Sequence, residues 1–118
     1  MQSKQRRNDF DEIVGRNQRV YVASSATVST KVMEPGEFNL FVTTTINNAI
    51  TVTLPSVDAA VGGIYTIWFV LDGTTADCTI EDKDGDAGYA DVVLTATADY
   101  LCVYSDGSHW IPLAEVST

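Results

Sequence analysis

The chain has 118 residues, 45% of them hydrophobic, and a net charge of −9. This length suffices for one domain with a hydrophobic core but not for a catalytic domain plus a regulatory one, so we expect a complete, single-domain gene product beginning at Met1. There is no signal-peptide pattern and no run of 18 apolar residues, so we expect a protein that is made in a cytoplasm and has no membrane partner.

The charges divide the chain into a basic N-terminal arm, residues 1–18, and an acidic β-domain, residues 19–118. Residues 1–19 carry five of the seven basic residues against three acidic ones, whereas residues 20–118 carry two against thirteen. An acidic body excludes nucleic acid as the main ligand, because phosphate binding needs a dense basic surface. We interpret the short basic tract KQRR as a solvated tail that becomes ordered on a partner.

One helical signal lies within the arm. Asn8 is suited to the N-cap and Gly15 to the stop, and the residues between them place Phe10, Ile13 and Val14 on one face. A helix of about two turns is not stable alone in water. We therefore expect it to form only when this apolar stripe docks on something else.

From Arg19 onward the pattern predicts β-strands. In FNLFVTTTINNAITVTLP, apolar residues alternate with polar ones on both sides of Asn47-Asn48, which predicts two strands. If these strands form a hairpin, a three-residue loop, Asn47 to Ala49, pairs Ile46 with Ile50 and Val42 with Leu54.

The next strand, IYTIWFVL, is apolar on both faces. Tyr65, Ile67, Phe69 and Leu71 form the predicted core side, and Ile64, Thr66, Trp68 and Val70 form the other side. A strand of this kind is usually covered on both faces, by its own fold or by another subunit. We therefore predict a self-association surface between copies at Thr66, Trp68 and Val70. A sugar-stacking platform of Trp68 and Trp110 is the alternative, but we expect Trp110 in the core.

An acidic loop, DKDGDAG, follows and invites comparison with a calcium loop. Asp82, Asp84 and Asp86 have the spacing of the first three ligands of an EF-hand, but Ala87 replaces the required glycine and Val93 the required glutamate. We predict a solvated turn and no metal site.

The last two predicted strands, DYLCVYS and HWIPLAE, are joined by Asp106-Gly107, a strong signal for a two-residue hairpin turn. That turn pairs Val103 with Trp110 and Tyr104 with His109. His109 lies close in sequence to Ser105 and Ser108, yet nothing in the turn supplies an oxyanion site, so we expect neither an enzyme nor a cofactor.

The two cysteines, Cys78 and Cys102, lack metal-ligand spacing, and we expect two buried thiols instead of a disulfide. Seven or eight short strands without a crossover helix predict an all-β, single-domain β-sandwich or small jelly-roll-like barrel with an extended N-terminal arm.

Four fragments in this order, TVTLPS, GGIYTIWF, CTIED and YLCVYSDGSHWIPL, resemble a β-module of tailed-bacteriophage virion proteins. The matching positions, which span roughly residues 50–113, are Leu54-Pro55, Gly62, Tyr65 to Ile67, Ser105 to Gly107 and Trp110. The module occurs in small capsid decoration (cement) proteins and in the end modules of fibres. One departure is Trp68, because that position is commonly polar in such modules.

The resemblance implies a structural protein on the outer capsid surface of a virion, assembled in the host cytoplasm, with the major capsid protein as partner. It carries no catalytic residues. We expect a homo-oligomer, a trimer, and an arm that binds the capsid through basic and apolar side chains: Lys4, Arg6, Arg7, Phe10, Ile13, Val14 and Arg16. A short fibre or tail accessory protein that contacts the host surface and a carbohydrate-binding module are the alternatives.

Overall fold

The computed structural model describes residues 19–73, 76–83, 85 and 90–118. These residues form nine β-strands: β1 (Arg19–Ala23), β2 (Thr30–Val32), β3 (Asn39–Thr43), β4 (Ile50–Thr53), β5 (Ile64–Leu71), β6 (Cys78–Glu81), β7 (Val92–Leu94), β8 (Tyr100–Ser105) and β9 (Trp110–Val116). No helix in this part of the chain has the length and apolarity needed to cross a membrane.

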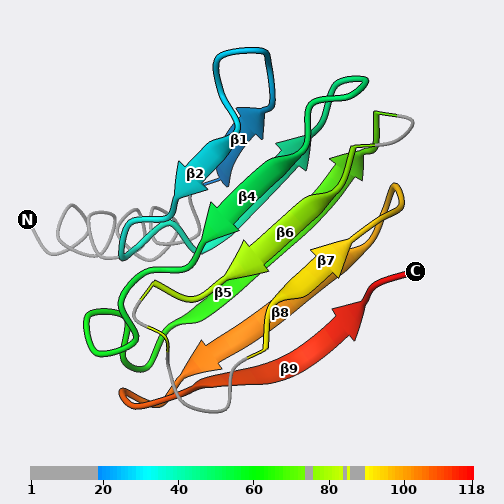
Figure 1. The fold of residues 1–118 in the computed structure, drawn as a ribbon. Coiled ribbons are helices and arrows are strands. Elements are labelled where there is room, and N and C mark those ends of the chain that lie inside the picture. Colours follow the sequence, from blue (N-terminus) through cyan, green and yellow to red (C-terminus); the bar gives the residue numbers. More distant parts are fainter. Residues whose placement is uncertain (1–18, 74–75, 84, 86–89) are drawn as a thin grey trace, which may run out of the picture.

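The strands form two sheets that face each other, so the predicted all-β sandwich is confirmed (Figure 1). The five-stranded sheet has the order β1-β3-β5-β8-β9, and the four-stranded sheet has the order β2-β4-β6-β7. In each sheet the first three strands are parallel to one another. Each later strand is antiparallel to the strand that precedes it in the sheet order.

The parallel strands arise because the chain alternates between the sheets. It passes from β1 in the five-stranded sheet to β2 in the four-stranded sheet and back, and it repeats this course through β6. Parallel neighbours need a crossover connection, and here the strand of the opposite sheet serves as that crossover. Each pair of parallel neighbours therefore joins segments 20 or more residues apart, as Arg19 lies beside Asn39.

The two strands predicted between residues 38 and 54 exist, but they do not form a hairpin, so the pairing of Ile46 with Ile50 across a three-residue loop does not occur. β3 and β4 belong to different sheets, and the turn from Thr45 to Asn48, with Asn47 at a φ of 65°, carries the chain from one layer to the other. The alternating pattern was sound, since Leu40, Val42 and Val52 are fully buried. Alternation indicates which face is buried, but it does not indicate which strand is the neighbour.

The hairpin from β8 to β9 exists, but its predicted register is also wrong. Ser105 pairs with Trp110 and Val103 with Pro112, so the loop has four residues, 106 to 109. The carboxylate of Asp106 accepts hydrogen bonds from the backbone N–H of Ser108 at 2.8 Å and of His109 at 2.6 Å. This Asx-type turn widens the loop, and the shift keeps Trp110 on the predicted core face.

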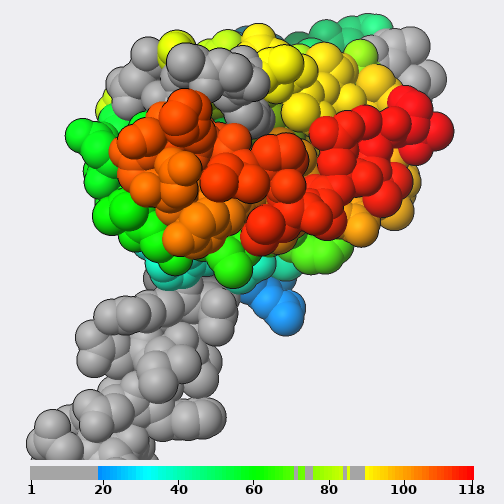
Figure 2. Space-filling model, turned by 90° about the horizontal axis from the view of Figure 1, so that it is seen from below, coloured from blue at the N-terminus to red at the C-terminus, as the bar shows by residue number. Residues whose placement is uncertain are grey.

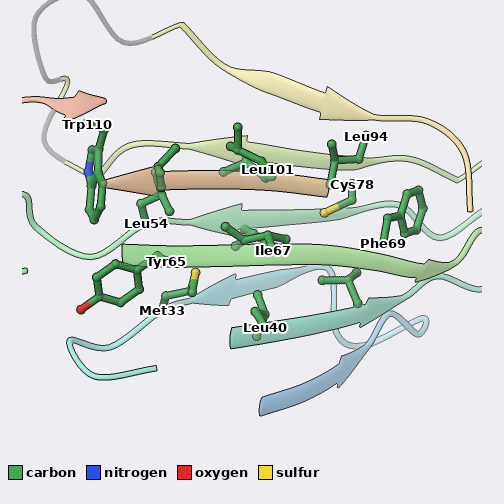
Figure 3. Packing of buried hydrophobic residues seen from close by; sticks show 14 of the residues in the cluster. Met33, Leu40, Leu54, Tyr65, Ile67, Phe69, Cys78, Leu94, Leu101 and Trp110 are labelled. Atoms are coloured by element: carbon green, nitrogen blue, oxygen red, sulfur yellow. The ribbon is translucent and has the colours of Figure 1, made fainter. Parts of the chain in front are cut away.

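The core lies between the two sheets (Figure 3). Alternate residues of the central strands point inward, and Tyr65, Ile67 and Phe69 on β5 are at most 1% exposed, as predicted. Trp110 is 4% exposed and stands edge-on to Tyr65, with ring centroids 5.5 Å apart. These contacts fix which face of β5 points into the core, so the residues between them must point to the outside.

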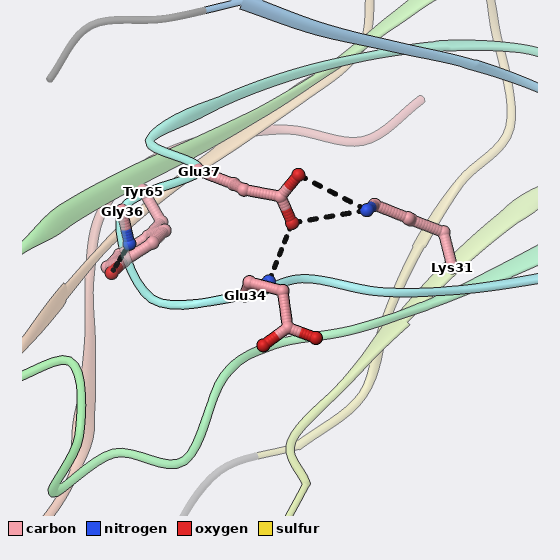
Figure 4. A network of polar contacts seen from close by, with 5 residues as sticks. All are labelled: Lys31, Glu34, Gly36, Glu37 and Tyr65. Carbon is pink, nitrogen blue, oxygen red and sulfur yellow. Dashed lines mark hydrogen bonds and ion pairs between the residues drawn. The ribbon is translucent and has the colours of Figure 1, made fainter. Parts of the chain in front are cut away.

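One end of the sandwich is held by polar contacts (Figure 4). The ammonium of Lys31 donates to both carboxylate oxygens of Glu37, at 3.1 and 3.2 Å, and the same carboxylate accepts from the backbone N–H of Glu34. The hydroxyl of Tyr65 accepts a hydrogen bond from the N–H of Gly36 at 3.0 Å. The turn before β3 is thereby tied to the core.

β1 and β2 are the edge strands on one side of the sandwich, and β9 and β7 are the edge strands on the other. Figure 2 shows the side with β9, in orange to red, and β7, in yellow. A groove of about 420 Å³ is lined there by Val92 and Val93 of β7 and by Trp110 and Pro112 of β9, among others. After Trp110, every residue of β9 is exposed. The five-stranded sheet thus extends one strand beyond the four-stranded sheet.

Candidate functional site

An aromatic row crosses the outer face of the five-stranded sheet. Its members are Tyr21 on β1, Phe41 on β3, Trp68 on β5 and Tyr100 on β8, each directly opposite the next in the strand register. Val116 on β9 continues the row to the other edge of the sheet. Because the inward-facing neighbours on β3, β5 and β8 are buried, these side chains project away from the core.

Neighbouring rings of the row lie against one another: Tyr21 with Phe41 and Phe41 with Trp68 are stacked, and Trp68 with Tyr100 is tilted. Ring centroids are 5.2 Å apart for Tyr21 and Phe41, 6.3 Å for Phe41 and Trp68, and 5.1 Å for Trp68 and Tyr100. Two rings lying flat side by side would need roughly 6.5 Å or more between centroids, because carbon atoms approach to about 3.5–4.0 Å. The pairs at 5.1 and 5.2 Å therefore overlap, which orders the row without any ligand.

Arg19 is the single charged side chain among the described residues on this face. Its guanidinium carbon lies 5.7 Å from the ring centroid of Phe41, a cation–π contact. Arg19, Asn39, Phe41 and Trp68 line an open groove of about 390 Å³. A face without carboxylates contrasts with the acidic remainder of the domain.

Further apolar side chains extend the row in both strand directions. They come from β5, β8 and β9: Ile64, Val70, Tyr104 and Ile111. Tyr21 is 72% exposed, Ile64 51%, Val70 48% and Trp68 37%. We define the outer face as the aromatic row, Val116 and these four residues, together with Arg19, Asn39, Thr66 and Cys102.

The predicted self-association residues lie on this outer face. Trp68 is at the centre of the row, on β5, which is the middle strand of the five. Thr66 and Val70 flank it at the neighbouring outward positions of the same strand. The predicted division of β5 into two faces is confirmed for the residues whose burial is described.

The sequence-based prediction missed Arg19, Tyr21, Phe41 and Tyr100. Tyr21 and Phe41 are 20 residues apart and meet only because β1 and β3 pair across an intervening strand of the other sheet. The one available signal was an aromatic residue at an outward position of several strands, as at Phe41 in NLFVT. The periodicity within one strand does not indicate which residue of another strand lies opposite it.

The two thiols have different surroundings. Cys78 is fully buried, and burial, with a smaller contribution from the charge of Asp77, raises its pKa to about 12. Cys102 is half-buried on the outer face, where it accepts a hydrogen bond from the hydroxyl of Thr66 at 3.5 Å. The prediction of two buried thiols is therefore right for Cys78 and wrong for Cys102.

The last hairpin uses its polar groups to hold the turn. Ser105 is buried, and its hydroxyl donates to the carbonyl of Val57 at 2.5 Å. The backbone N–H of Ser108, followed by that of His109, lowers the pKa of the exposed Asp106. The imidazole of His109 lies 3.8 Å from that carboxylate on the surface. The hydroxyl of Ser105 is therefore directed at backbone and not at the imidazole.

Two further predictions fall largely outside the described residues. Of the acidic loop, Asp82 is described, whereas Asp84 and Asp86 are not. The predicted capsid-binding residues of the arm, Lys4 to Arg16, all lie in the part of the chain that is not described. Within the described residues, no group of three or more histidine, cysteine or acidic side chains could hold a metal ion.

Comparisons with protein-family models, with curated proteins and with solved structures find no match to this chain. The chain's own residues and the outer face are therefore the basis for inferring its function.

Proposed function

We propose that this protein is a structural virion protein of a tailed bacteriophage, which decorates and stabilises the outer surface of the capsid. The observation that carries the proposal is the outer face, a pre-ordered aromatic surface without carboxylates on an otherwise acidic β-domain. Interfaces favour Trp, Tyr and Arg and are depleted in Asp and Glu. The sequence resemblance to phage β-modules supports the setting on a capsid.

The arm supplies the contact with the major capsid protein. Its basic residues oppose the acidity of the domain, and its apolar stripe belongs to a segment too short to form a stable helix or core by itself. If the shell surface is acidic, the basic residues govern the association rate and its salt dependence, whereas Phe10, Ile13 and Val14 govern the lifetime of the complex.

The test mixes undecorated capsids with full-length variants and measures association and dissociation rates at several salt concentrations. Arg6→Glu with Arg7→Glu should slow association and reduce its salt dependence. Phe10→Ser with Ile13→Ser should instead raise the dissociation rate, by roughly tenfold or more if two apolar anchors are lost. Lys83→Glu, an exposed charge change on the β-domain, is the matched control and should leave both rates unchanged.

Undiminished binding by both arm variants would show that the arm does not hold the shell. A protein that fails to bind capsids but attaches to phage tails or to host cells would support a short fibre or tail accessory protein instead.

A carbohydrate-binding module is the second candidate, and the groove beside Arg19, Asn39 and Trp68 is the observation that favours it. Sugars stack on exposed ring faces, and Tyr21 and Trp68 are 72% and 37% exposed, but each ring of the row also packs against a neighbouring ring. Binding to a glycan array without any capsid affinity would favour this candidate over the capsid protein.

A further inference from the structure

The side of the sandwich formed by β7 and β9 has a place for one more strand. The five-stranded sheet continues as far as β9, whereas the four-stranded sheet ends at β7 (Figure 1). Pro112 and Glu115 lie on the inner face of β9, because their partners on β8, Val103 and Leu101, are buried in the core. No strand of the described residues continues the four-stranded sheet past β7, and the groove of about 420 Å³ lies there.

We propose that this groove binds an extended polypeptide segment of the capsid shell, which adds beside β7 as a fifth strand of the four-stranded sheet and brings a lysine or arginine to Glu115. The inference rests on the proposed function, since it takes the shell protein as the source of the segment. It adds a contact on the β-domain to the one assigned to the arm.

β7 differs from the other edge strands in having no feature that protects its edge. A strand at a sheet edge presents unpaired N–H and C=O groups, and proteins commonly block such edges with charged residues or proline. Among the edge strands, β1 carries Arg19, β2 carries Lys31, and β9 carries Pro112 and Glu115. β7, with the sequence VVL, carries neither a charge nor a proline. Its free edge is therefore the one best suited to accept an added strand.

The groove has an apolar lining that includes an unpaired hydrogen-bond donor. Leu101, Trp110 and Pro112 line it on the side of the five-stranded sheet, and Val92 and Val93 line it on the side of β7. Trp110 is 4% exposed, and its indole N–H has no acceptor within the described part of the chain. A buried donor without an acceptor destabilises the free domain. An added strand brings backbone carbonyls to this groove and so offers the indole an acceptor.

The charge of the groove selects the kind of segment. Its described lining residues include two acidic ones, Asp91 and Glu115, and no basic one. Both are exposed, and neither forms an ion pair with a described residue, although Glu115 accepts a hydrogen bond from the hydroxyl of Ser117 at 2.7 Å. An acidic segment is repelled here and a basic one is attracted. The groove therefore fits a strand in which apolar residues and a lysine or arginine share one face.

This chain itself offers no segment of that kind. The β-domain is acidic, so its strands carry the wrong charge for the groove. The arm is basic, but its apolar residues Phe10, Ile13 and Val14 have helical spacing and do not alternate as in a strand. The shell protein is thus favoured over a second copy as the source.

The first measurement titrates isotope-labelled full-length protein with two acetylated heptapeptides and follows the indole N–H signals by NMR. The peptides are Thr-Val-Thr-Val-Thr-Lys-Thr and the reverse sequence, which place two valines and a lysine on one face of a strand in either direction. We expect at least one peptide to shift the signal of Trp110, in the groove, and to leave that of Trp68, on the outer face, unchanged. A synthetic peptide of residues 1–18 should shift neither signal.

The second measurement tests strand addition itself. Successive N–H groups of a strand point to opposite sides, so N-methylation of the valines and lysine blocks one edge of the peptide and N-methylation of the threonines blocks the other. Addition beside β7 uses one edge only. One methylated peptide should therefore bind at least about tenfold more weakly than the parent, and the other should bind about as well.

The third measurement tests the charge of the groove. Glu115→Lys should weaken peptide binding by about tenfold or more. Glu34→Lys, the matched control, alters an exposed carboxylate between β2 and β3 and should leave binding unchanged. An unaltered Trp68 signal shows that each variant keeps its fold. With undecorated capsids, Glu115→Lys should dissociate faster than Glu34→Lys.

Failure of both heptapeptides to shift the Trp110 signal, or equal binding by the two methylated peptides, would overturn strand addition in the groove. Stronger binding by the peptide of residues 1–18 would make a second copy the occupant. If Glu115→Lys bound capsids as well as Glu34→Lys, the shell would not be the source. Wild-type protein that binds the heptapeptides but no capsid would contradict the proposed function and leave the affinity of the groove for strands standing.

Discussion

Asp99 is a buried carboxylate that accepts hydrogen bonds from two separate segments of the chain. It is 2% exposed and accepts hydrogen bonds from the N–H groups of Thr95 and Ala96, both at 3.1 Å, and from the N–H and hydroxyl of Thr118 at 2.9 and 2.7 Å. Desolvation acts to raise its pKa, but these hydrogen bonds together outweigh it and lower the pKa. The carboxylate thereby connects the turn before β8 to the segment after β9.

We expect Asp99→Asn to lower the free energy of unfolding by about 1–2 kcal/mol at neutral pH. The amide keeps one oxygen for the three N–H donors and offers its NH₂ to the hydroxyl of Thr118, so the substitution removes mainly the charge. A carboxylate with a lowered folded-state pKa stabilises fully above the pKa of the unfolded chain, about 4, and this contribution is lost as the pH falls through the folded-state value.

Urea denaturation of both proteins between pH 7 and pH 2 measures this difference. The wild type and Asp99→Asn should converge below pH 4. A difference that stays constant over the whole range would contradict the role assigned to the charge.

At the scale of elements, the sequence allowed the strands and their buried faces to be predicted, but not their partners. Alternation in residues 38–54 places Leu40 and Val52 inside correctly, and the same pattern is compatible with a hairpin or with two strands in different sheets. Tyr21 pairs with Phe41 because the chain alternates between the two sheets, and this alternation is a property of the whole fold. For the same reason, Trp68 was found from its own strand, whereas the rest of the row was not.

The loop that follows β5 requires close backbone contact with the turn that follows β3. A Cβ at Gly73 would lie 2.4 Å from the carbonyl carbon of Thr45 and 2.7 Å from the carbonyl oxygen of Thr44. The hydroxyl of Thr44 accepts a hydrogen bond from the N–H of Gly73 at 2.8 Å and donates to the carbonyl of Ala76 at 3.2 Å. Neither backbone segment can move without breaking these contacts.

We therefore expect Gly73→Ala to lower the free energy of unfolding by about 3 kcal/mol, measured by chemical denaturation. The control is Gly36→Ala, where φ is +99° but no atom lies within 4 Å of the added Cβ. That substitution should cost only the backbone strain, about 1–2 kcal/mol. Equal costs for the two variants would show that the Gly73 contact has no steric role.

At the scale of the whole molecule, charge and hydrophobicity are separated in space. None of the described acidic residues of the β-domain lies on the outer face, and most of the basic residues are in the arm. In the proposed function, the basic arm joins each domain to the shell. The acidic part of each domain would then face solvent and keep decorated particles apart through like-charge repulsion.

We propose that this chain lies on the outside of a capsid, and the most direct measurement is an electron-microscopy map of the virion that carries it. We expect density for the protein projecting from the outer surface of the head, and loss of that density from particles that lack the protein. Density confined to the tail, or a head surface that is unchanged when the protein is absent, would contradict the account.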